Sequence, residues 1–576
     1  MATFGVATSP ERQAKRRLPI VAWSCAMATV LALATVVPVA ARKVDEAASS
    51  VENMAAVSRI AATSAPAPPS SVNVTFICRS TPYPSACETA LTSAEARAAG
   101  DPFAASVQFA MARATTARAL ARNLSASAPP WGMRDCAELL DISLAQLRGA
   151  LAGCASDAAG ATTWLSAALT NQGTCNDSLA AAAAGRDAVR KQVAALAQFI
   201  STALALHVKK VKGGRGGGIP PSAAATSPSR GTAFPSWLSE HDRRLLESPA
   251  TNTMTADAVV ALDGSGTHGS INEAIAAVTA PVMGTKASGG GGGGSKRKVI
   301  HVKAGRYKES VSILYQQENV MLVGDGKGKT IIDGDKSVAG GYTTFSSATV
   351  AAMGAGFIAK GLSIVNSAGA GKGQAVALLA GGDRSVVYQC EITAFQDTLF
   401  THSNRQFFAE DHISGTVDFI FGNSAAVFQN CDIQARKPSH GQEDVVTAQG
   451  RDDPNQNTGI SIHRCRIAGA PDLGETPVYL GRPWKGYARV AVMESAMDGS
   501  VAAAGWLAWS DQPAPSTIYY GEYGNTGAGA GTNGRVTWTG VHTSMSTADA
   551  TGFTVAKFIM GDSWLGATGV SYISGL

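Results

Sequence analysis

The stretch Tyr388-Gln-Cys-Glu-Ile392 decides the fold, because its pattern recurs along the chain. The copies are Ala409-Glu-Asp-His-Ile413, Phe428-Gln-Asn-Cys-Asp-Ile433 and Ile462-His-Arg-Cys-Arg-Ile467. Spacings of 21, 20 and 34 residues separate their equivalent positions, Cys390, Asp411, Cys431 and Cys465. Irregular periods of this size, each with one short strand, are typical of a parallel β-helix, whose coils stack at about 4.8 Å.

Other short apolar runs after residue 255 support this interpretation. Val299-Ile-His-Val302, Val320-Met-Leu-Val-Gly324 and Thr330-Ile-Ile-Asp-Gly334 read as strands of four or five residues bounded by turn formers. A β-sandwich is the alternative, but it would place hairpin turns every 8–12 residues or so. The sequence therefore favours the β-helix over the sandwich.

Composition and charge set wider limits. The chain has 576 residues, of which 45% are hydrophobic and 16% charged, and 62 are glycine. The apolar share is sufficient for a large core and excludes global disorder, and the length indicates two to four domains. The formal net charge of +5 is small and not gathered in one block, so we expect no nucleic-acid partner.

The N-terminal segment, residues 1–45, carries a targeting signal. An uncharged run, Ile20 to Ala41, follows a basic cluster made of Arg12, Lys15, Arg16 and Arg17. This pattern predicts either a cleaved signal peptide or an uncleaved signal anchor, and the two remain open alternatives. Both export the chain, and only the anchor would leave it attached to a membrane.

Residues 72–208 are rich in Ala and Leu at helical spacing, which predicts a bundle of about four helices. Residues 209–250 contain Gly, Pro, Ser and Lys in proportions that cannot build a core, so we expect a linker. The dibasic sequence at its end, Arg243-Arg244-Leu245-Leu246, is a candidate proteolytic processing site. Residues 251–576 form the expected β-helix domain.

Cysteine positions agree with an exported protein. Five of the nine cysteines lie between residues 78 and 175, where we expect pairing that leaves one thiol over. The glycosylation sequons begin at Asn73, Asn123 and Asn176, all before residue 200.

Several catalytic motifs are absent from the sequence. There is no Gly-x-Ser-x-Gly, no complete phosphate loop, and no His or Cys spacing typical of a metal site. Four scattered histidines are read as structural or surface residues: His402, His412, His440 and His463.

One constellation between residues 374 and 484 does suggest chemistry. Asp397 and Asp418 are 21 residues apart, which is one coil, so their carboxylates should lie on neighbouring rungs of one face. Two such close carboxylates cannot both ionise easily, which yields an acid and a nucleophile or base. Arg482 could keep Asp418 ionised. Gln374 and Gln396 supply amide donors suited to an oxyanion, and Trp484 offers an apolar surface on which a sugar ring could stack.

These strings resemble the plant pectin methylesterases that carry an N-terminal inhibitor-like pro-region. The catalytic strings that carry the resemblance are Gly305-Arg-Tyr-Lys-Glu309, Gln374-Ala-Val-Ala-Leu378, Gln396-Asp-Thr-Leu399, Asp418-Phe-Ile-Phe-Gly422 and Leu480-Gly-Arg-Pro-Trp484. The resemblance implies a right-handed parallel β-helix, hydrolysis of galacturonate methyl esters in pectin, and no metal or organic cofactor. It also implies a secreted protein of the plant cell wall.

The resemblance also implies roles for individual residues. Asp418 would be the nucleophile and Asp397 the general acid, later base, while Gln374 and Gln396 stabilise the oxyanion. The implied substrate contacts are Thr344, Gln374, Arg482 and Trp484, with Phe421 in the groove.

The first domain resembles the pectin methylesterase inhibitor fold. This implies the disulfides Cys78–Cys87 and Cys136–Cys175, with Cys154 left free. Such a pro-region would silence the enzyme until a protease, expected to be subtilisin-like, cuts at Arg243-Arg244-Leu245-Leu246.

Two departures from the family pattern stand out. Asp411 occupies a position where we expect cysteine in the family, so Cys431 lacks that partner, and Cys390, two coils away, is beyond disulfide reach. We therefore predict an unpaired Cys431. Phe400 stands where Tyr is common, which could alter substrate preference.

Two other functions remain alternatives at this stage. One is a binding protein, in which an inhibitor bundle is fused to a catalytically silent β-helix that grips pectin. The other is a pectate lyase or polygalacturonase, although lyases need Ca²⁺-binding carboxylate clusters and galacturonases use a different set of aspartates.

Overall fold

The computed structural model describes residues 73–125, 131–180, 185–214, 255–280, 296–510 and 513–576. The targeting segment, the dibasic site and most of the expected linker lie outside these residues. Within the described ranges, no helix combines the length and apolar character that crossing a bilayer requires.

The first part of the described chain is helical, as expected. Four long helices, α5 to α8, follow three short ones and pack on one another. Their bounds are α2 (Val74–Cys78), α3 (Pro84–Leu91), α4 (Ala94–Ala99), α5 (Pro102–Ser125), α6 (Trp131–Gly153), α7 (Ala158–Ala180) and α8 (Arg186–Gly214). Helix α8 continues through residues 209–214, which were expected to belong to the linker. Lysines in its last turns favour this continuation, because cations stabilise the C-terminal end of a helix.

Disulfides join neighbouring helices of this part. Cys78–Cys87 links α2 to α3, and Cys136–Cys175 links α6 to α7, which are the two expected pairs. Cys154 is free. Small residues allow close helix packing, since α5 buries Ala110, Ala114, Ala117 and Ala121 completely.

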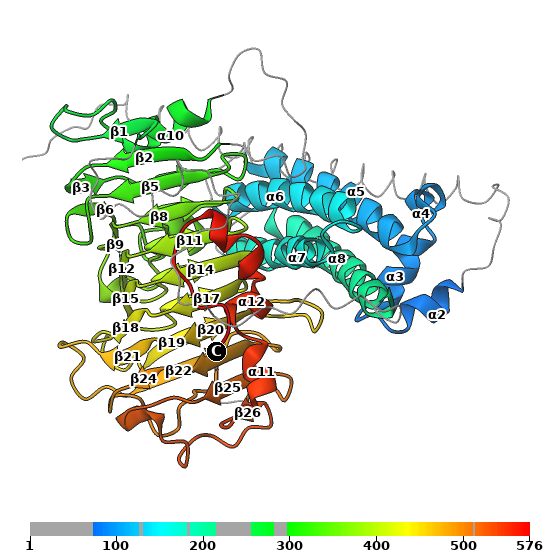
Figure 1. The fold of residues 1–576 in the computed structure, drawn as a ribbon. Coiled ribbons are helices and arrows are strands. Elements are labelled where there is room, and N and C mark those ends of the chain that lie inside the picture. Colours follow the sequence, from blue (N-terminus) through cyan, green and yellow to red (C-terminus); the bar gives the residue numbers. More distant parts are fainter. Residues whose placement is uncertain (1–72, 126–130, 181–184, 215–254, 281–295, 511–512) are drawn as a thin grey trace, which may run out of the picture. The chain divides into compact units, whose positions relative to one another are not determined.

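The second part is a parallel β-helix of three sheets, which confirms the predicted fold class. The first sheet, within the described residues, contains β1 (Ala258–Val260), β2 (Lys298–Val302), β5 (Val320–Gly324), β8 (Ile358–Lys360), β11 (Ser385–Tyr388), β14 (Arg405–Ala409), β17 (Ala425–Gln429), β20 (Gly459–His463), β23 (Arg489–Met493), β25 (Tyr519–Tyr523) and β26 (Val541–His542). Figure 1 shows its strands stacked in the order β2, β5, β8, β11, β14, β17 and β20.

The other two sheets have the same parallel pairing. The second contains β3 (Gly305–Lys308), β6 (Thr330–Gly334), β9 (Ser363–Asn366), β12 (Glu391–Thr393), β15 (His412–Gly415), β18 (Asp432–Ala435), β21 (Arg466–Gly469) and β24 (Ala496–Met497). The third contains β4 (Val311–Ile313), β7 (Val350–Ala352), β10 (Leu378–Ala380), β13 (Leu399–Thr401), β16 (Ile420–Gly422), β19 (Asp444–Gln449) and β22 (Val478–Pro483). From β2 to β22 the chain visits the three sheets in a constant cycle, one strand each per coil.

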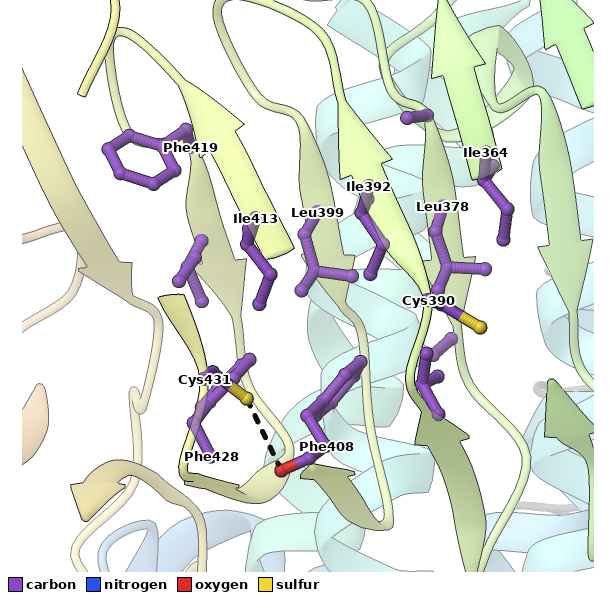
Figure 2. Close-up of a cluster of buried hydrophobic side chains, with 14 of the residues drawn as sticks. Ile364, Leu378, Cys390, Ile392, Leu399, Phe408, Ile413, Phe419, Phe428 and Cys431 are labelled. Carbon is purple, nitrogen blue, oxygen red and sulfur yellow. Dashed lines mark hydrogen bonds between the residues drawn. The ribbon is translucent and has the colours of Figure 1, made fainter. Parts of the chain in front are cut away.

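The repeat in the sequence corresponds to a ladder of isoleucines inside the β-helix. The second sheet places six buried isoleucines in register on successive coils, from β6 to β21: Ile332, Ile364, Ile392, Ile413, Ile433 and Ile467. Figure 2 shows Ile364, Ile392 and Ile413 in the shared core with Leu378 and Leu399 of the third sheet. Stacking like residues at a constant register fills the interior without gaps, which favours this fold.

Aromatic residues and thiols complete the same interior. Phe408 and Phe428 stack with ring centroids 4.6 Å apart, and Cys431 lies beside them (Figure 2). Cys431 is a free thiol, as predicted, and Cys465 on the next coil accepts its backbone N–H at 3.4 Å.

Short helices pack on the β-helix at its N-terminal end and on the outer face of its first sheet. Ser270 is the N-cap residue of helix α10 (Ile271–Thr279), and the Glu309 carboxylate accepts hydrogen bonds from the backbone N–H groups of Ile271 and Asn272. Near the C-terminus, α11 (Thr547–Thr551) and α12 (Val555–Phe558) belong to apolar clusters on the outer face of the first sheet. Glu309 thus has a capping contact, which stabilises the start of α10.

Candidate active site

Asp397 and Asp418 occupy equivalent positions on adjacent coils. Each lies in the turn from the second sheet to the third, two residues before a third-sheet strand, and the following residues Leu399 and Ile420 are in register. The Asp397 backbone N–H donates to the Val417 carbonyl at 3.0 Å. Both aspartates have a left-handed backbone, with φ of 62° and 53°. The structure therefore brings the predicted carboxylates together on one edge of the third sheet.

Arg482 reaches Asp418 from β22. Its Nε donates to Oδ1 and its Nη2 to Oδ2, both at 2.8 Å, which is the bidentate geometry of an arginine–carboxylate pair. The outer face of the third sheet carries a register row made of Phe400, Phe421, Ala448 and Arg482. Arg482 therefore lies two coils beyond Phe421 and extends back toward Asp418.

The two carboxyl groups differ in their electrostatics. Only 8% of Asp397 and 5% of Asp418 is exposed. Burial raises the pKa of Asp397 well above its ordinary value, and the negative charge of Asp418 raises it further. Burial also raises the pKa of Asp418, but the hydrogen bonds and the positive charge of Arg482 oppose that rise. Asp397 is thus the group that holds a proton, and Asp418 is the group that ionises first.

A cavity of about 390 Å³ lies directly over these residues. Its walls include Gln374 and Gln396, whose half-buried side chains provide amide donors beside the carboxylates. The other predicted site residues that line it are Thr344, Asp397, Asp418, Phe421, Arg482 and Trp484. Every predicted catalytic or substrate-contacting residue thus meets at one cavity.

Gln374 lies in a different local structure from the one expected. The string Gln374-Ala-Val-Ala was expected to begin a strand, whereas β10 begins only at Leu378. The preceding residues form the turn that crosses from the second sheet to the third, and the Ala375 backbone N–H donates to the Gln396 carbonyl at 3.1 Å. This turn directs both glutamines to the same cavity.

Aromatic side chains form one wall of the cavity. Phe400 and Phe421 stack with ring centroids 4.3 Å apart, and Trp484 meets Phe421 edge-on at 6.1 Å. Sequence reasoning missed Trp509, which is 41% exposed, lines the cavity and lies 4.5 Å under the Arg482 guanidinium. A lone tryptophan in a turn gives no periodic signal, so only its position in the fold reveals it.

The helical part contributes side chains to the same cavity. Four residues of α7 line it, namely Thr174, Asp177, Ser178 and Ala180. Other hydrogen bonds connect α7 to the turns that follow the third-sheet strands: Thr174 to His402 at 3.0 Å, Asn423 to Thr170 at 2.9 Å, Asn457 to Thr163 at 3.0 Å and Trp164 to Asp383 at 3.3 Å. Helix α6 adds a hydrogen bond from Thr343 to Asp135.

The remaining candidates do not join the cavity. The string Gly305–Glu309 contains β3 of the second sheet and the α10-capping Glu309, so it stabilises structure away from the carboxylates. His402 is buried between Phe345 and Phe400, and burial lowers its pKa to about 3. No three His, Cys, Asp or Glu side chains of the described chain are grouped as metal ligands would be.

Two family models match the chain. The model described as Pectinesterase matches residues 257–562, and the model described as Plant invertase/pectin methylesterase inhibitor matches residues 73–206. These ranges lie inside the two domains expected from the sequence.

Curated relatives and a solved structure resemble the chain as well. "Probable pectinesterase/pectinesterase inhibitor 35" of Arabidopsis thaliana is 47% identical over 492 residues, 82% of this chain and 88% of that protein. "Pectinesterase 1" of Citrus sinensis is 44% identical over 469 residues, 77% of this chain and 76% of that protein. The solved pectin methylesterase from carrot is 50% identical with a TM-score of 0.53, covering 56% of this chain and 99% of that chain. A little more than half of this chain thus corresponds to nearly the whole carrot protein.

Proposed function

The chain belongs to the pectinesterase family, and from that premise we propose that it hydrolyses galacturonate methyl esters in pectin. The reaction releases methanol and leaves acidic pectin, so the partner is methylesterified homogalacturonan. One observation carries the proposal: Asp397 and Asp418 are stacked on adjacent coils at a cavity, and Arg482 binds both oxygens of Asp418.

In the first half of the reaction, an ionised Asp418 oxygen attacks the ester carbonyl carbon. The tetrahedral intermediate carries its negative charge on the former carbonyl oxygen, which accepts hydrogen bonds from the Gln374 and Gln396 amides. As the bond to the methoxy oxygen breaks, protonated Asp397 gives its proton to that oxygen, and methanol leaves. The galacturonate carbonyl is now bonded to Asp418 as an acyl-enzyme.

In the second half, the ionised Asp397 takes a proton from water as the water oxygen attacks the same carbonyl carbon. The bond to Asp418 breaks and returns its electron pair to that carboxylate, while Asp397 is protonated again. The two roles follow from the surroundings of the two groups, since Asp397 has the higher pKa and Asp418 has the arginine.

Substrate binding relies on the aromatic wall and its polar neighbours. Trp484 and Phe421 provide apolar surfaces against which a pyranose ring can pack, and Thr344 and Arg482 add polar contacts at the cavity. The Phe400 ring stacks on the Phe421 ring. Having Phe instead of Tyr at this position therefore changes packing in the groove and leaves the two carboxylates untouched.

The helical part acts as a pro-region in this proposal. Its residues Thr174, Asp177 and Ser178 share the cavity with the carboxylates, so a polymer cannot enter while α7 stays there. Release follows cleavage at Arg243-Arg244-Leu245-Leu246 by a subtilisin-like protease, and the mature enzyme acts outside the cell on wall pectin.

Methanol release from highly methylated pectin tests the proposed reaction. Residues 251–576 should release methanol, and Asp418→Asn should lower the rate by about a thousandfold or more. Pectin binding without methanol release would favour the silent binding protein. Unsaturated or shortened sugars among the products would favour the lyase or galacturonase.

A further inference from the structure

Three glycosylation sequons of the sequence have no role in the proposed reaction. They begin at Asn73, Asn123 and Asn176, and all of them lie in the helical part. After Ser178 the sequence contains no further sequon. An oligosaccharide on an asparagine is bulky and needs a surface position, so each site must leave its side-chain amide nitrogen open to solvent.

Asn176 lies in the last turn of α7, and only one atom of its side-chain amide is engaged. The Asn176 Oδ1 accepts a hydrogen bond from Arg190 Nε of α8 at 2.9 Å. The Asn176 Nδ2 donates none within the described chain, and the side chain is half-buried. A sugar bonded to Nδ2 therefore leaves the link between α7 and α8 intact.

Asn176 also lies on the side of α7 away from the β-helix. The threonines of α7 that hydrogen-bond to the β-helix form one stripe, made of Thr163, Thr170 and Thr174. Since each residue of an α-helix turns the chain by about 100°, Asn176 lies about 200° around the helix axis from Thr174. A sugar at this position extends away from the stripe, so glycosylation and packing of α7 on the β-helix are compatible.

Asn123 and Asn73 meet the same conditions. Asn123 is exposed and follows Ala121 by two residues, and Ala121 belongs to the completely buried row of α5. Asn123 is therefore on the opposite side of α5 from that row. Asn73 is exposed, and its Oδ1 caps α2 by accepting the backbone N–H of Phe76 at 2.9 Å. Neither asparagine donates a hydrogen bond from Nδ2 within the described residues, so a sugar there breaks no native contact.

Many asparagines of the β-helix use the same nitrogen differently. Asn272, Asn366, Asn404 and Asn525 each donate from Nδ2 to a group of the β-helix itself. A sugar on such a nitrogen would displace a native hydrogen bond. The free Nδ2 atoms thus separate the three sequon asparagines from these four, in agreement with the distribution of sequons along the chain.

From this geometry we propose that Asn73, Asn123 and Asn176 each carry an N-linked oligosaccharide, and that the β-helix carries none. The sugar donor is a lipid-linked oligosaccharide diphosphate of the secretory route. The asparagine Nδ2 loses one proton to a base and bonds to C1 of the first sugar. The bond between C1 and the diphosphate oxygen breaks, and the lipid diphosphate leaves with the electron pair.

All the N-linked sugar then belongs to the part that cleavage removes. This consequence rests on the proposed function, because it requires export and separation at Arg243-Arg244-Leu245-Leu246. The uncleaved chain is a glycoprotein, whereas the mature β-helix meets the polymer with no oligosaccharide on its own surface. The sugar content of the extracellular protein therefore reports whether the helical part is still attached.

The experiment produces the full chain in a eukaryotic secretory host and treats it with an amidase that releases N-linked sugars. The amidase converts each glycosylated asparagine to aspartate, so peptide mass mapping identifies the sites. We expect conversion at Asn73, Asn123 and Asn176 and none within residues 251–576. The single variants Asn73→Gln, Asn123→Gln and Asn176→Gln should each remove one of three steps in the mass of the intact protein, and the triple variant should show no mass loss on treatment.

Asn533→Gln is the matched control, because Asn533 is exposed in the β-helix part and does not begin a sequon. It should leave the mass loss unchanged. A variant that stays inside the cell is measured in the same way, so poor folding does not hide the result. Any of the three asparagines left unconverted, or conversion within residues 251–576, would overturn the proposal. The mass measurement does not depend on methanol release, so a failure of the proposed reaction is seen separately.

Discussion

Arg482 and Asp418 are joined by two parallel hydrogen bonds, Nε to Oδ1 and Nη2 to Oδ2, each 2.8 Å long. Asp397 occupies the equivalent position one coil earlier and has no such pair, so burial and the neighbouring charge leave it with a strongly raised pKa. Two residues of the same type therefore have opposite protonation preferences. The predictions on activity below follow from this difference.

Replacing Arg482 should change both the rate and its pH dependence. We expect Arg482→Gln to lower kcat/KM by about 10²–10³-fold, because the ionised nucleophile loses a buried charge-assisted partner. Asp418 must be ionised, so activity falls as pH drops through its pKa. Without the guanidinium that pKa rises further, and the acid limb should move to higher pH. The pH profile of kcat/KM measures this, with Arg466→Gln, an exposed arginine paired with Asp432, as control. An unmoved acid limb would contradict the assignment.

Replacing Asp397 should remove the alkaline limb of the pH profile. The group must be protonated when methanol leaves, so activity is lost as pH rises through its raised pKa. Asp397→Asn should lower kcat by about 10²–10⁴-fold, the usual contribution of a general acid, and leave a residual rate without the alkaline limb. Measurement of kcat across pH checks both effects. An alkaline limb that survives in the variant would assign it to another group.

The α6 contact should make stability of the full chain depend on pH. Asp135 is 4% exposed and accepts a hydrogen bond from Thr343, and burial raises its pKa from 3.8 to about 6. Since the folded state binds this proton more tightly than the unfolded state, its contribution is present below about pH 4 and is lost as pH rises through 6. A rise of the pKa from 3.8 to about 6 corresponds to about 3 kcal/mol of stability when the group is protonated in both states.

Urea unfolding at pH 4.5 and pH 7.5 measures that contribution, with Asp135→Asn as the comparison. The asparagine cannot titrate, so the variant should lose about 2 kcal/mol of the stability difference between these two pH values, because pH 4.5 already lies above the unfolded-state pKa of 3.8. An identical dependence in both proteins would show that Asp135 is not the responsible group.

The isoleucine ladder should account for part of the stability of the β-helix. Ile413 is completely buried between Ile392 and Ile433. Ile413→Ala should lower the free energy of unfolding by about 3 kcal/mol, and Ile413→Val by about 1 kcal/mol, because each leaves a cavity of different size. Chemical denaturation measures both values. Equal effects of the two substitutions would mean that the coil collapses around the missing atoms.

Much of the β-helix could be predicted because its signal is local and repeated. Each copy of the pattern at Ile392, Ile413, Ile433 and Ile467 supplies one rung, and the spacing of 21 residues between Asp397 and Asp418 equals one coil. A constant register converts such a spacing directly into proximity. The disulfides of the helical part were expected from the family resemblance, and the structure contains both.

The contacts that the sequence left open join residues with no regular spacing. Trp509 meets Arg482 through a turn, and Thr174 meets His402 across 228 residues. No period links these positions, and their side chains meet only after separate elements have packed. The turn at Gln374 and the continuation of α8 to Gly214 were missed for a simpler reason, since local composition does not define where an element begins or ends.

By itself, the sequence determined the coil period, the isoleucine interior and the pairing of Asp397 with Asp418, because all three depend on the distance along the chain between like residues. Only the tertiary structure decided that Arg482 binds Asp418 and not Asp397, and that Asp177 of α7 lines the same cavity as Trp484. Those arrangements depend on the directions in which long side chains extend across several coils, and direction is a property that residue spacing does not contain.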